Sequence, residues 1–421
     1  MGSAARPVEW RLLRGLFDAA VAAADPMRCL GAFLPPKPTS GRVVVVGAGK
    51  ASARMAEAVE ALWGPCEGLV ITRYGHARPC QGIEIVEASH PVPDAAGAQA
   101  TARMLAILEG LGEGDFVLSL ISGGASALLC APAPGVSLAQ KQALNAALLA
   151  SGMPIDRMNV VRKHLSRVKG GQLAAAAFPA QMLSLLISDV PGDRVADIGS
   201  GPVVGEASRP EEALAALAQF DVPVPPALRA AITASRVVPP DDPRCARARA
   251  EIIAAPAQSL AAAARAAEGC EVRLLGDAIE GEAREVARAQ AETALAVQRD
   301  LPPDARPVLL LSGGELTVTR RGDGIGGPNA EFCLALALAL NGAPGIHAIA
   351  CDTDGVDGAA EVAGALIGPD TLERARAAGL NAAQALHNND AHRFFAALGD
   401  QVIPGPTLTN VNDFRAILIA P

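Results

Sequence analysis

The chain has 421 residues, of which half are hydrophobic and 19% are charged, and its formal net charge is −8 at pH 7. This length exceeds what one hydrophobic core usually organises, so two domains are expected. The acidic balance and an aromatic content of 3% argue against a nucleic-acid surface, which needs a basic stripe and side chains that stack on bases.

A membrane location is not expected either. No run approaches about 18 uninterrupted apolar residues, and the first predicted helix, over residues 10–24, is amphipathic because it carries Arg11, Arg14 and Asp18. These charges argue against a signal peptide. The sequence therefore predicts a cytoplasmic protein with small-molecule substrates and no nucleic-acid or membrane partner, and it leaves a homodimer open.

Four apolar runs predict buried parallel strands, because they are rich in β-branched residues or leucine. They cover residues 43–46, 116–121, 182–187 and 346–350. Helix-like segments alternate with them, which is typical of an α/β protein. Each run ends in a small, polar or acidic loop, and ligands bind beyond the carboxyl ends of strands in open α/β sheets. The four loops are therefore the candidates for chemistry.

The loop after the first run, residues 47–52, reads Gly-Ala-Gly-Lys-Ala-Ser. Glycines at a strand-to-helix turn let the backbone approach an anion, and the helix N-terminus supplies free N–H groups. The loop completes neither a dinucleotide fingerprint, which needs Gly or Ala in place of Ser52, nor a Walker A loop. Gly49 and Lys50 are candidates for phosphate binding, and a plain turn with a solvated lysine is the alternative.

The loop after the second run contains Ser122, Gly123, Gly124 and Ser126. Two consecutive glycines after a buried strand can form a nest of backbone donors, with two hydroxyls beside it. Such a nest suits a phosphate or a carboxylate. The loop does not spell the G-x-S-x-G of a serine hydrolase, so both serines are expected to bind a ligand rather than attack it.

A basic cluster comes next, with Arg162, Lys163, His164 and Lys169 ahead of two glycines. It could supply local positive charge for an anionic substrate in an otherwise acidic chain. Arg162 and Lys163 are the candidates for contact with that substrate. A solvated helix face is the alternative.

Carboxylates follow the third run, where Asp189 and Asp193 share a loop with Pro191 and Gly192. A carboxylate at a strand end can hold Mg²⁺ against phosphate oxygens or accept the proton of an attacking hydroxyl. Ordinary turn chemistry is the alternative, since Asp is a common turn residue.

The fourth run leads into a second acidic loop, with Asp352, Asp354 and Asp357. Their spacing departs from that of an EF-hand, and Ala363 stands where the last glutamate of such a loop belongs. An acidic cluster beside glycines at a strand end still suits a site for Mg²⁺ and a nucleotide.

A proline-rich segment over residues 221–243 is predicted to separate two domains, residues 1–240 and 241–421. Sets of strand-like and helix-like segments flank it on both sides. The alternative is a long surface loop inside one domain. Eight cysteines are scattered without a C-x-x-C pair, so they are expected to be buried small hydrophobic residues.

Eight segments, in order along nearly the whole chain, resemble the glycerate 2-kinase family. They are VVVGAGKAS (44–52), ISGGASAL (121–128), VRKHLSRVKGG (161–171), ISDVPGDRVADIGSGP (187–202), LSGGE (311–315), GGPNAEF (326–332), DTDGVDG (352–358) and TNVND (409–413). The last segment resembles part of the MOFRL-type C-terminal region of that family, here about residues 307–415.

The resemblance implies a Rossmann-like N-terminal domain, a smaller mixed α/β C-terminal domain, and an active site in the cleft between them. It implies a kinase that transfers the γ-phosphoryl group of ATP to the 2-hydroxyl of D-glycerate and so makes 2-phosphoglycerate. Mg²⁺ or another divalent metal is the implied cofactor.

The resemblance also implies roles for individual residues. Lys50 would neutralise charge on the transferring phosphoryl group, and Asp189 would orient or deprotonate the 2-hydroxyl. The loop from Ser122 to Gly124, with Ser126, would hold the substrate carboxylate or a phosphate. The implied nucleotide contacts are Gly313, Gly314, Asn329, Asp354 and Asn410, and the implied metal ligands are Asp193, Glu315 and Asp352.

One departure concerns an arginine. The resemblance implies one in the glycine-rich segment over residues 324–328, which here contains none. We expect Arg320 or Arg321 to replace it.

An NADPH-dependent hydroxypyruvate reductase is the alternative from another enzyme class. Gly47 and Gly49 approach a dinucleotide fingerprint, and Arg73 stands near the end of the next strand, as the 2′-phosphate of NADP favours. Lys50, the double glycine and the acidic strand ends have no evident role in hydride transfer. A non-enzymatic sensor of a sugar acid or a nucleotide is the third interpretation.

Overall fold

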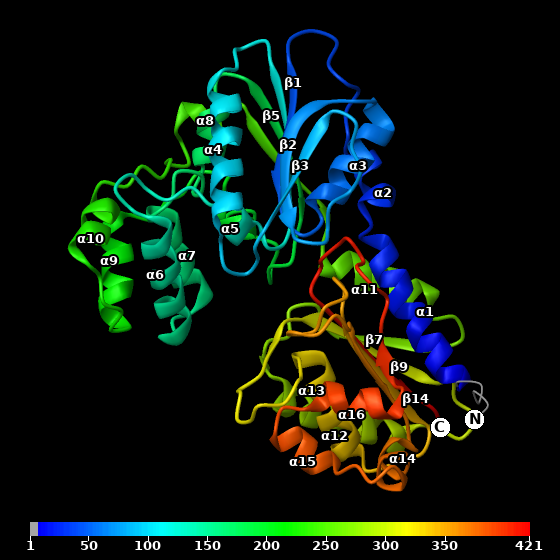
Figure 1. Cartoon of the computed structure of the whole chain (residues 1–421). Helices are drawn as coiled ribbons and strands as arrows, with labels where there is room; N and C mark the ends of the chain where they lie inside the picture. Colours follow the sequence, from blue (N-terminus) through cyan, green and yellow to red (C-terminus); the bar gives the residue numbers. More distant parts are fainter. Residues whose placement is uncertain (1–6) are drawn as a thin grey trace. The chain divides into compact units, whose positions relative to one another are not determined.

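The protein is described here by a computed structural model that covers residues 7–421. Two compact units divide the chain (Figure 1). The N-terminal unit consists of residues 26–253, and the C-terminal unit consists of residues 254–421 together with residues 7–25.

This division differs from the predicted boundary at residue 240 in two respects. The strand over residues 248–254 belongs to the N-terminal sheet, and the first helix packs with the C-terminal unit. Helix α1 (Val8–Ala23) lies against α11 (Pro256–Ala266). The Ser259 hydroxyl on α11 donates to the Ala20 carbonyl over 2.9 Å. The predicted amphipathic helix is therefore confirmed, and its apolar face is buried in the C-terminal unit.

The proline-rich segment lies inside the N-terminal unit. It contains a helix of its own, α10 (Pro226–Thr233), which packs beside α9 (Pro210–Gln219). Leu228 and Ile232 of α10 are buried in a shared core. Proline at the first position of a helix costs no hydrogen bond, so these prolines begin a helix instead of a linker.

The N-terminal unit is built on a six-stranded sheet with the order β3-β2-β1-β4-β5-β6. The pairs among β1 to β5 are all parallel. Three of the predicted strands are confirmed here, as β1, β4 and β5. The strands are β1 (Val43–Ala48), β2 (Glu67–Arg73), β3 (Ile83–Ala88), β4 (Phe116–Ile121), β5 (Gln181–Ile187) and β6 (Ala248–Ala254).

Helices cover this sheet and extend beyond it as a separate helical group, which Figure 1 shows around α6, α7, α9 and α10. The helices not yet bounded are α2 (Pro26–Cys29), α3 (Ser52–Trp63), α4 (Ala95–Glu109), α5 (Ala125–Leu128), α6 (Leu138–Ala150), α7 (Ile155–His164) and α8 (Gln172–Ala177). Among the described residues, no helix has both the length and the apolar character needed to cross a membrane.

The C-terminal unit contains a second six-stranded sheet, with the order β13-β12-β11-β14-β9-β7. The prediction that the fourth apolar run is a parallel strand is wrong, because β11 pairs antiparallel with both β12 and β14. An apolar run reports that a strand is buried and carries no information on its direction. The strands are β7 (Glu271–Gly276), β9 (Val308–Gly314), β11 (Ile346–Asp352), β12 (Gly364–Ile367), β13 (Gln401–Val402) and β14 (Asp413–Ile419).

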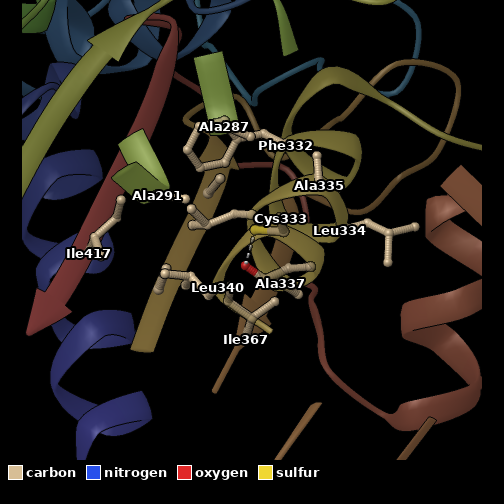
Figure 2. Close-up of a cluster of buried hydrophobic side chains, with 14 of the residues drawn as sticks. Ala287, Ala291, Phe332, Cys333, Leu334, Ala335, Ala337, Leu340, Ile367 and Ile417 are labelled. Atoms are coloured by element: carbon tan, nitrogen blue, oxygen red, sulfur yellow. Dashed lines mark hydrogen bonds between the residues drawn. The ribbon is translucent and has the colours of Figure 1, made fainter. Parts of the chain in front are cut away.

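Helix α13 (Pro328–Leu340) forms the centre of this unit. It is apolar on all sides, and a helix of that kind is stable only when surrounded by protein. Figure 2 shows its side chains packed against α12 (Ala283–Asp300) and the sheet, with the Cys333 thiol directed at the Ala365 carbonyl over 3.3 Å. The remaining elements are β8 (Gly281–Glu282), β10 (Leu316–Thr317), α14 (Thr371–Ala377), α15 (Ala382–His387) and α16 (Ala391–Leu398).

A buried ion pair joins α12 to α13. Arg284 Nε donates to Glu331 Oε1 over 2.5 Å, and its Nη2 donates to the Leu386 carbonyl over 2.6 Å. The second oxygen of Glu331 accepts from the Asn389 amide over 2.9 Å. Both oxygens of Glu331 and two of the three guanidinium nitrogens of Arg284 therefore have partners. Such additional hydrogen bonds are what make a buried ion pair tolerable.

Replacing Arg284 with Ala should destabilise the protein by about 3–5 kcal/mol, because it leaves the Glu331 carboxylate buried without its cation. Arg288→Ala, at an exposed position of the same helix, is the control and should change stability by less than about 0.5 kcal/mol. Denaturant unfolding of the two variants measures the difference. Equal stabilities would show that the ion pair contributes nothing.

Candidate functional site

Two of the predicted loops lie against each other in the N-terminal unit. The Lys50 N–H donates to the Gly123 carbonyl over 2.8 Å, and the Ala51 N–H donates to Ser122 Oγ over 3.0 Å. Their strands, β1 and β4, are adjacent and parallel, so both loops emerge at the same edge of the sheet. The structure therefore brings Lys50 and the glycine loop together.

Gly49 is required at this junction by the close approach of the second loop. Its φ is +144°, and a Cβ at this position would lie 2.0 Å from Ser122 Oγ. Ser122 is fully buried, and its hydroxyl also lies 3.3 Å from Ser52 Oγ. The Ser122 hydroxyl therefore holds the two loops together, which differs from the predicted contact with substrate.

The Lys50 side chain borders the space at Gly124. Gly124 has a φ of +83°, and a Cβ there would lie 3.2 Å from Lys50 Cγ and 3.1 Å from the His90 ring. Both side chains thus approach the glycine loop closely. A larger residue at position 124 would displace them.

Ser126 continues this loop into the interior. Its hydroxyl lies 2.7 Å from Ser200 Oγ, and its carbonyl accepts from Lys169 Nζ over 2.8 Å. Ser200 has a φ of +65°, which is an uncommon conformation for a residue other than glycine. Ser126 is thereby fixed by a hydroxyl from one side and an ammonium group from the other.

The basic cluster is not a solvated helix face, so that interpretation is wrong. Lys163, His164 and Lys169 are buried, and Arg162 is half-buried. Arg162 Nε donates to Asn145 Oδ1 over 2.9 Å, and burial lowers the pKa of Arg162. Lys163 behaves differently, because it forms a buried ion pair with Glu206. The two predicted substrate contacts therefore differ. Glu206 neutralises the charge of Lys163, whereas the partner of Arg162 Nε is a neutral amide oxygen.

Asp189 and Asp193 follow β5 at the same edge as the two loops above. Asp193 adopts a positive φ of 53°, and its Oδ1 is buried without a hydrogen-bond partner. Asp189 is half-buried. An acceptor-only oxygen without a donor is costly when buried, so Asp193 is suited to a cation or to a donor from a ligand.

In the C-terminal unit, three predicted segments meet at one sheet edge. β9 and β11 both run antiparallel to β14, so their carboxyl ends lie beside the start of β14. Asp413 at that start pairs in register with Gly314 on one side and with Asp352 on the other. The predicted residues after these strands, among them Glu315 and Asp354, therefore gather around Asp413.

The acidic loop after β11 is stabilised by its own turns. Asp352 Oδ1 accepts from the Asp354 N–H over 2.9 Å, and Asp354 Oδ1 accepts from the Val356 N–H over 2.8 Å. Across the edge, Asn410 Oδ1 accepts from the Asn412 N–H over 3.3 Å. Asp352 and Asp354 therefore each use one carboxylate oxygen to stabilise the turns of their own loop.

Asp357 holds the start of α13. Its carboxylate accepts from the backbone N–H groups of Asn329 and Ala330 over 2.9 and 2.8 Å. His392 Nε2 lies 3.1 Å from Asp357 Oδ2. A carboxylate at a helix N-terminus satisfies free donors and complements the helix dipole. Asp357 therefore fixes the start of α13 and is not assigned as a metal ligand.

Asn329 and Asp413 connect α13 to the sheet edge. The Asn329 amide donates to Asp413 Oδ1 over 2.6 Å, and Arg415 Nη1 donates to Asp413 Oδ2 over 2.8 Å. Burial raises the pKa of Asp413, and the Arg415 guanidinium opposes that shift. Arg415 also donates to the Gly313 carbonyl. Asn329 Oδ1 is buried without a partner and remains available to a ligand.

The glycine-rich segment before α13 is explained by close packing. A Cβ at Gly322, Gly324 or Gly326 would lie 2.1–2.8 Å from atoms of residues 388–390, and one at Gly327 would lie 2.4 Å from the Asp357 carboxyl carbon. Of the two proposed replacement arginines, both exposed, Arg320 bonds to the Gly322 carbonyl over 3.2 Å. This contact leaves its guanidinium on the loop itself.

Each unit by itself contains oxygen donors of the kind that Mg²⁺ binds. Within the described part of the chain, no group of three or more His, Cys, Asp or Glu side chains is arranged to hold a metal ion. Mg²⁺ commonly takes only one or two protein carboxylates and completes its shell with substrate phosphates and waters. In the N-terminal unit, the orphaned oxygen of Asp193 fits that pattern. In the C-terminal unit, the carboxylates of Asp352 and Asp354 fit it.

Several residues of these clusters were missed from the sequence. Arg415 is a charge inside an otherwise apolar strand, two residues after Asp413, and that pattern was a usable signal. Lys141 of α6, whose Nζ donates to the Leu165 carbonyl over 3.4 Å, lies in a helix rich in alanine and leucine. Nothing in that sequence pattern marks this lysine. His90 and Ser200 come close to the glycine loop only through the tertiary fold.

Gly49→Ala should remove most of the activity of this site, because the added methyl group would collide with the Ser122 hydroxyl and force Lys50 away from Gly123. Gly15→Ala is the control, since a Cβ at Gly15 on α1 meets no atom within 4 Å and alanine favours a helix. Turnover and melting temperature of both variants provide the measurement. A fully active Gly49→Ala protein would contradict the tight junction.

Comparisons with known proteins agree with these motifs. Residues 12–233 match the family model described as "Domain of unknown function (DUF4147)", and residues 308–413 match that of the MOFRL family. A protein of Agrobacterium vitis with the provisional name hydroxypyruvate reductase is 50% identical over 97% of this chain and 94% of its own. The D-glycerate 2-kinase of Thermotoga maritima is 38% identical over 91% of this chain and 92% of its own.

The fold is also similar to a solved structure. The crystal structure of glycerate kinase from Thermotoga maritima superimposes with a TM-score of 0.87 at 36% identity, covering 98% of this chain and 100% of that one. The chain belongs to the glycerate 2-kinase family that its sequence motifs resemble.

Proposed function

We propose that this protein is a kinase that transfers the γ-phosphoryl group of ATP to the 2-hydroxyl of D-glycerate, giving 2-phosphoglycerate and ADP. The observation that carries the proposal is the junction of Lys50 with the glycine loop, where a cation borders backbone suited to a phosphate. The relative named D-glycerate 2-kinase, similar over nearly the whole chain, supports the same activity.

In the N-terminal unit, we assign the transferring group and the acceptor. Lys50 would neutralise the phosphoryl oxygens, and Gly123, Gly124 and Ser126 would position the substrate. Asp189 would accept the proton of the 2-hydroxyl as its oxygen bonds to the γ-phosphorus. The bond from that phosphorus to the β–γ bridging oxygen breaks, and ADP leaves with the electron pair. Catalysis of this kind depends on alignment and charge neutralisation.

In the C-terminal unit, we assign the nucleotide and its metal. Gly313, Gly314, Asn329, Asp354 and Asn410 are the proposed nucleotide contacts. Mg²⁺ would neutralise charge on the phosphate oxygens. The proposed ligands are Glu315 and Asp352 of this unit, together with Asp193 of the N-terminal unit. The orphaned oxygens of Asp193 and Asn329 support these assignments.

We further propose that the N-terminal unit is Rossmann-like and that the two units close over one active site. The strand order 3-2-1-4-5-6 of its sheet is that of dinucleotide-binding folds, which supports the first part. The complementary assignments of the two units require the second. A cytoplasmic location remains part of this proposal.

A hydroxypyruvate reductase is the second candidate, because two relatives carry that provisional name and the strand order suits a dinucleotide. Against it, the Ser52 hydroxyl donates to the Leu120 carbonyl over 2.9 Å, so the third position of the fingerprint is engaged in loop packing. Lys50 and Asp189 would also have no part in hydride transfer.

An assay of both reactions side by side separates the candidates. ADP release with ATP, D-glycerate and Mg²⁺ should be rapid and should depend on the acceptor, whereas NADPH oxidation with hydroxypyruvate should stay at background. NADPH consumption without ADP release would establish the reductase and remove the roles of Lys50 and Asp189.

Lys50→Ala should lower turnover by about 10²–10³-fold, the usual loss when one group that stabilises transition-state charge is removed. Its melting temperature should stay unchanged, because the Lys50 hydrogen bond to Gly123 uses the backbone. Lys37→Ala removes a lysine whose Nζ bonds to the Pro65 carbonyl, and it should keep full activity. A Lys50→Ala rate near that of the wild type would exclude Lys50 from the mechanism.

Closure of the two units should be visible in solution. Small-angle scattering should give a smaller radius of gyration with a non-hydrolysable ATP analogue and D-glycerate than without ligands, because closure makes the protein more compact. Closure would serve the reaction by excluding water from the reacting groups. Identical scattering curves at saturation would contradict closure.

A further inference from the structure

A pocket of about 220 Å³ lies within the N-terminal unit, between α6, α7 and the loop around residue 91. Three cationic side chains line it, from Lys141, Arg162 and Lys169. The remaining wall is largely apolar and includes Leu144 and Leu148. The pocket thus combines concentrated positive charge with a hydrocarbon surface.

The three cations are held in place by neutral acceptors. Lys169 Nζ donates to the carbonyls of Ser126 and Leu129 over 2.8 and 3.3 Å. Lys141 Nζ donates to the Leu165 carbonyl over 3.4 Å, and Arg162 Nε donates to an amide oxygen. Within residues 7–421, none of the three forms an ion pair with a carboxylate.

This arrangement is costly without a counter-ion. Burial lowers the pKa of Lys169 and of Lys141, and the neighbouring cations lower both further. The adjacent Lys163 shows the contrast, because Glu206 neutralises it in the same region. A buried cation either gains a counter-charge or tends to lose its proton. An anion bound in this pocket would therefore stabilise the charged forms of all three side chains.

The pocket adjoins the proposed phosphoryl-transfer site. Its lining includes Ser126 and His90. Ser126 belongs to the glycine loop, and the His90 ring borders Gly124 beside Lys50. A short ligand with its anionic end among the three cations would therefore have its other end near the glycine loop.

We propose that this pocket is the carboxylate subsite of the acceptor, in which Lys141, Arg162 and Lys169 bind a small 2-hydroxy acid by its carboxylate and the leucine wall contacts its carbon chain. This inference rests on the proposed function. It adds Lys141 and Lys169 to the substrate contacts, leaves Lys163 out, and assigns the carboxylate, rather than a phosphate, to this position.

The apolar wall favours a carboxylic acid over a phosphate. A phosphate carries oxygens on all sides and would leave several of them against Leu144 and Leu148 without donors, which is costly in a buried site. A carboxylate directs its two oxygens one way and its carbon chain the other. The pocket should therefore also accept short aliphatic acids, which bind without reacting because they have no hydroxyl.

The test is a binding measurement that needs no turnover. Calorimetry on the Lys50→Ala protein, free of ATP, should show binding of D-glycerate and of butanoate, and no binding of butanamide, which has the same chain without the charge. In the same background, Arg162→Gln and Lys141→Met should each weaken binding of both acids by roughly ten- to a hundredfold. Arg157→Gln, at an exposed position of α7, is the matched control and should bind as the parent does.

Kinetics provide a second readout. With Lys50 intact, Arg162→Gln and Lys141→Met should raise KM for D-glycerate more than they lower kcat, and butanoate should inhibit competitively against D-glycerate. Two variants are used so that a folding defect in one, detected by its melting temperature, does not decide the result.

Unchanged binding of D-glycerate in both folded variants would overturn the proposal. Displacement of butanoate by millimolar inorganic phosphate but not by D-glycerate would overturn it as well, because the pocket would then hold a phosphate. Failure of the proposed function is distinguishable: carboxylate binding that depends on Arg162, in a protein that releases no ADP, would retain the subsite and reject the kinase.

Discussion

The contact between two strand-end loops determines how the rest of the candidate site is arranged. The Lys50 N–H bonds to the Gly123 carbonyl, and Ser122 fills the space that a side chain at position 49 would need. Because of this contact, Lys50 after β1 and the glycine loop after the adjacent strand β4 lie side by side. Ser126, at the end of the same loop, accepts a hydrogen bond from the buried Lys169 and so connects the glycine loop to the basic cluster.

In the C-terminal unit, strand pairing rather than a contact between loops brings the predicted residues together. There the antiparallel pairing of β14 with β9 and β11 aligns Asp413 with Gly314 and Asp352. Arg415 and Asn329 complete the contacts of Asp413 inside the unit. The two units thus differ in charge: cations line the pocket of the first, and the sheet edge of the second is acidic. This difference is consistent with the proposal that the first unit binds the acid acceptor and the second the metal and nucleotide.

The sequence was most informative where local chemistry fixes local structure. Strand-end loops such as Gly49–Lys50 could be located because glycine and β-branched residues mark strand ends directly. Direction was not predictable for the strand over residues 346–350, since burial looks the same in parallel and antiparallel sheets. The ion-pair partners of single charges could not be predicted either. Arg162 and Lys163 are neighbours in sequence, and only the fold places Glu206 beside Lys163.

The central claim is phosphoryl transfer to the 2-oxygen of D-glycerate, and ³¹P NMR of the reaction mixture tests it most directly. The protein, ATP, Mg²⁺ and D-glycerate should give ADP together with one new phosphomonoester signal, split by the single proton on carbon 2. A signal split by the two protons of carbon 3 would mean that the 3-oxygen of D-glycerate is phosphorylated, which would contradict the claim. The absence of any new phosphomonoester would contradict the account as a whole.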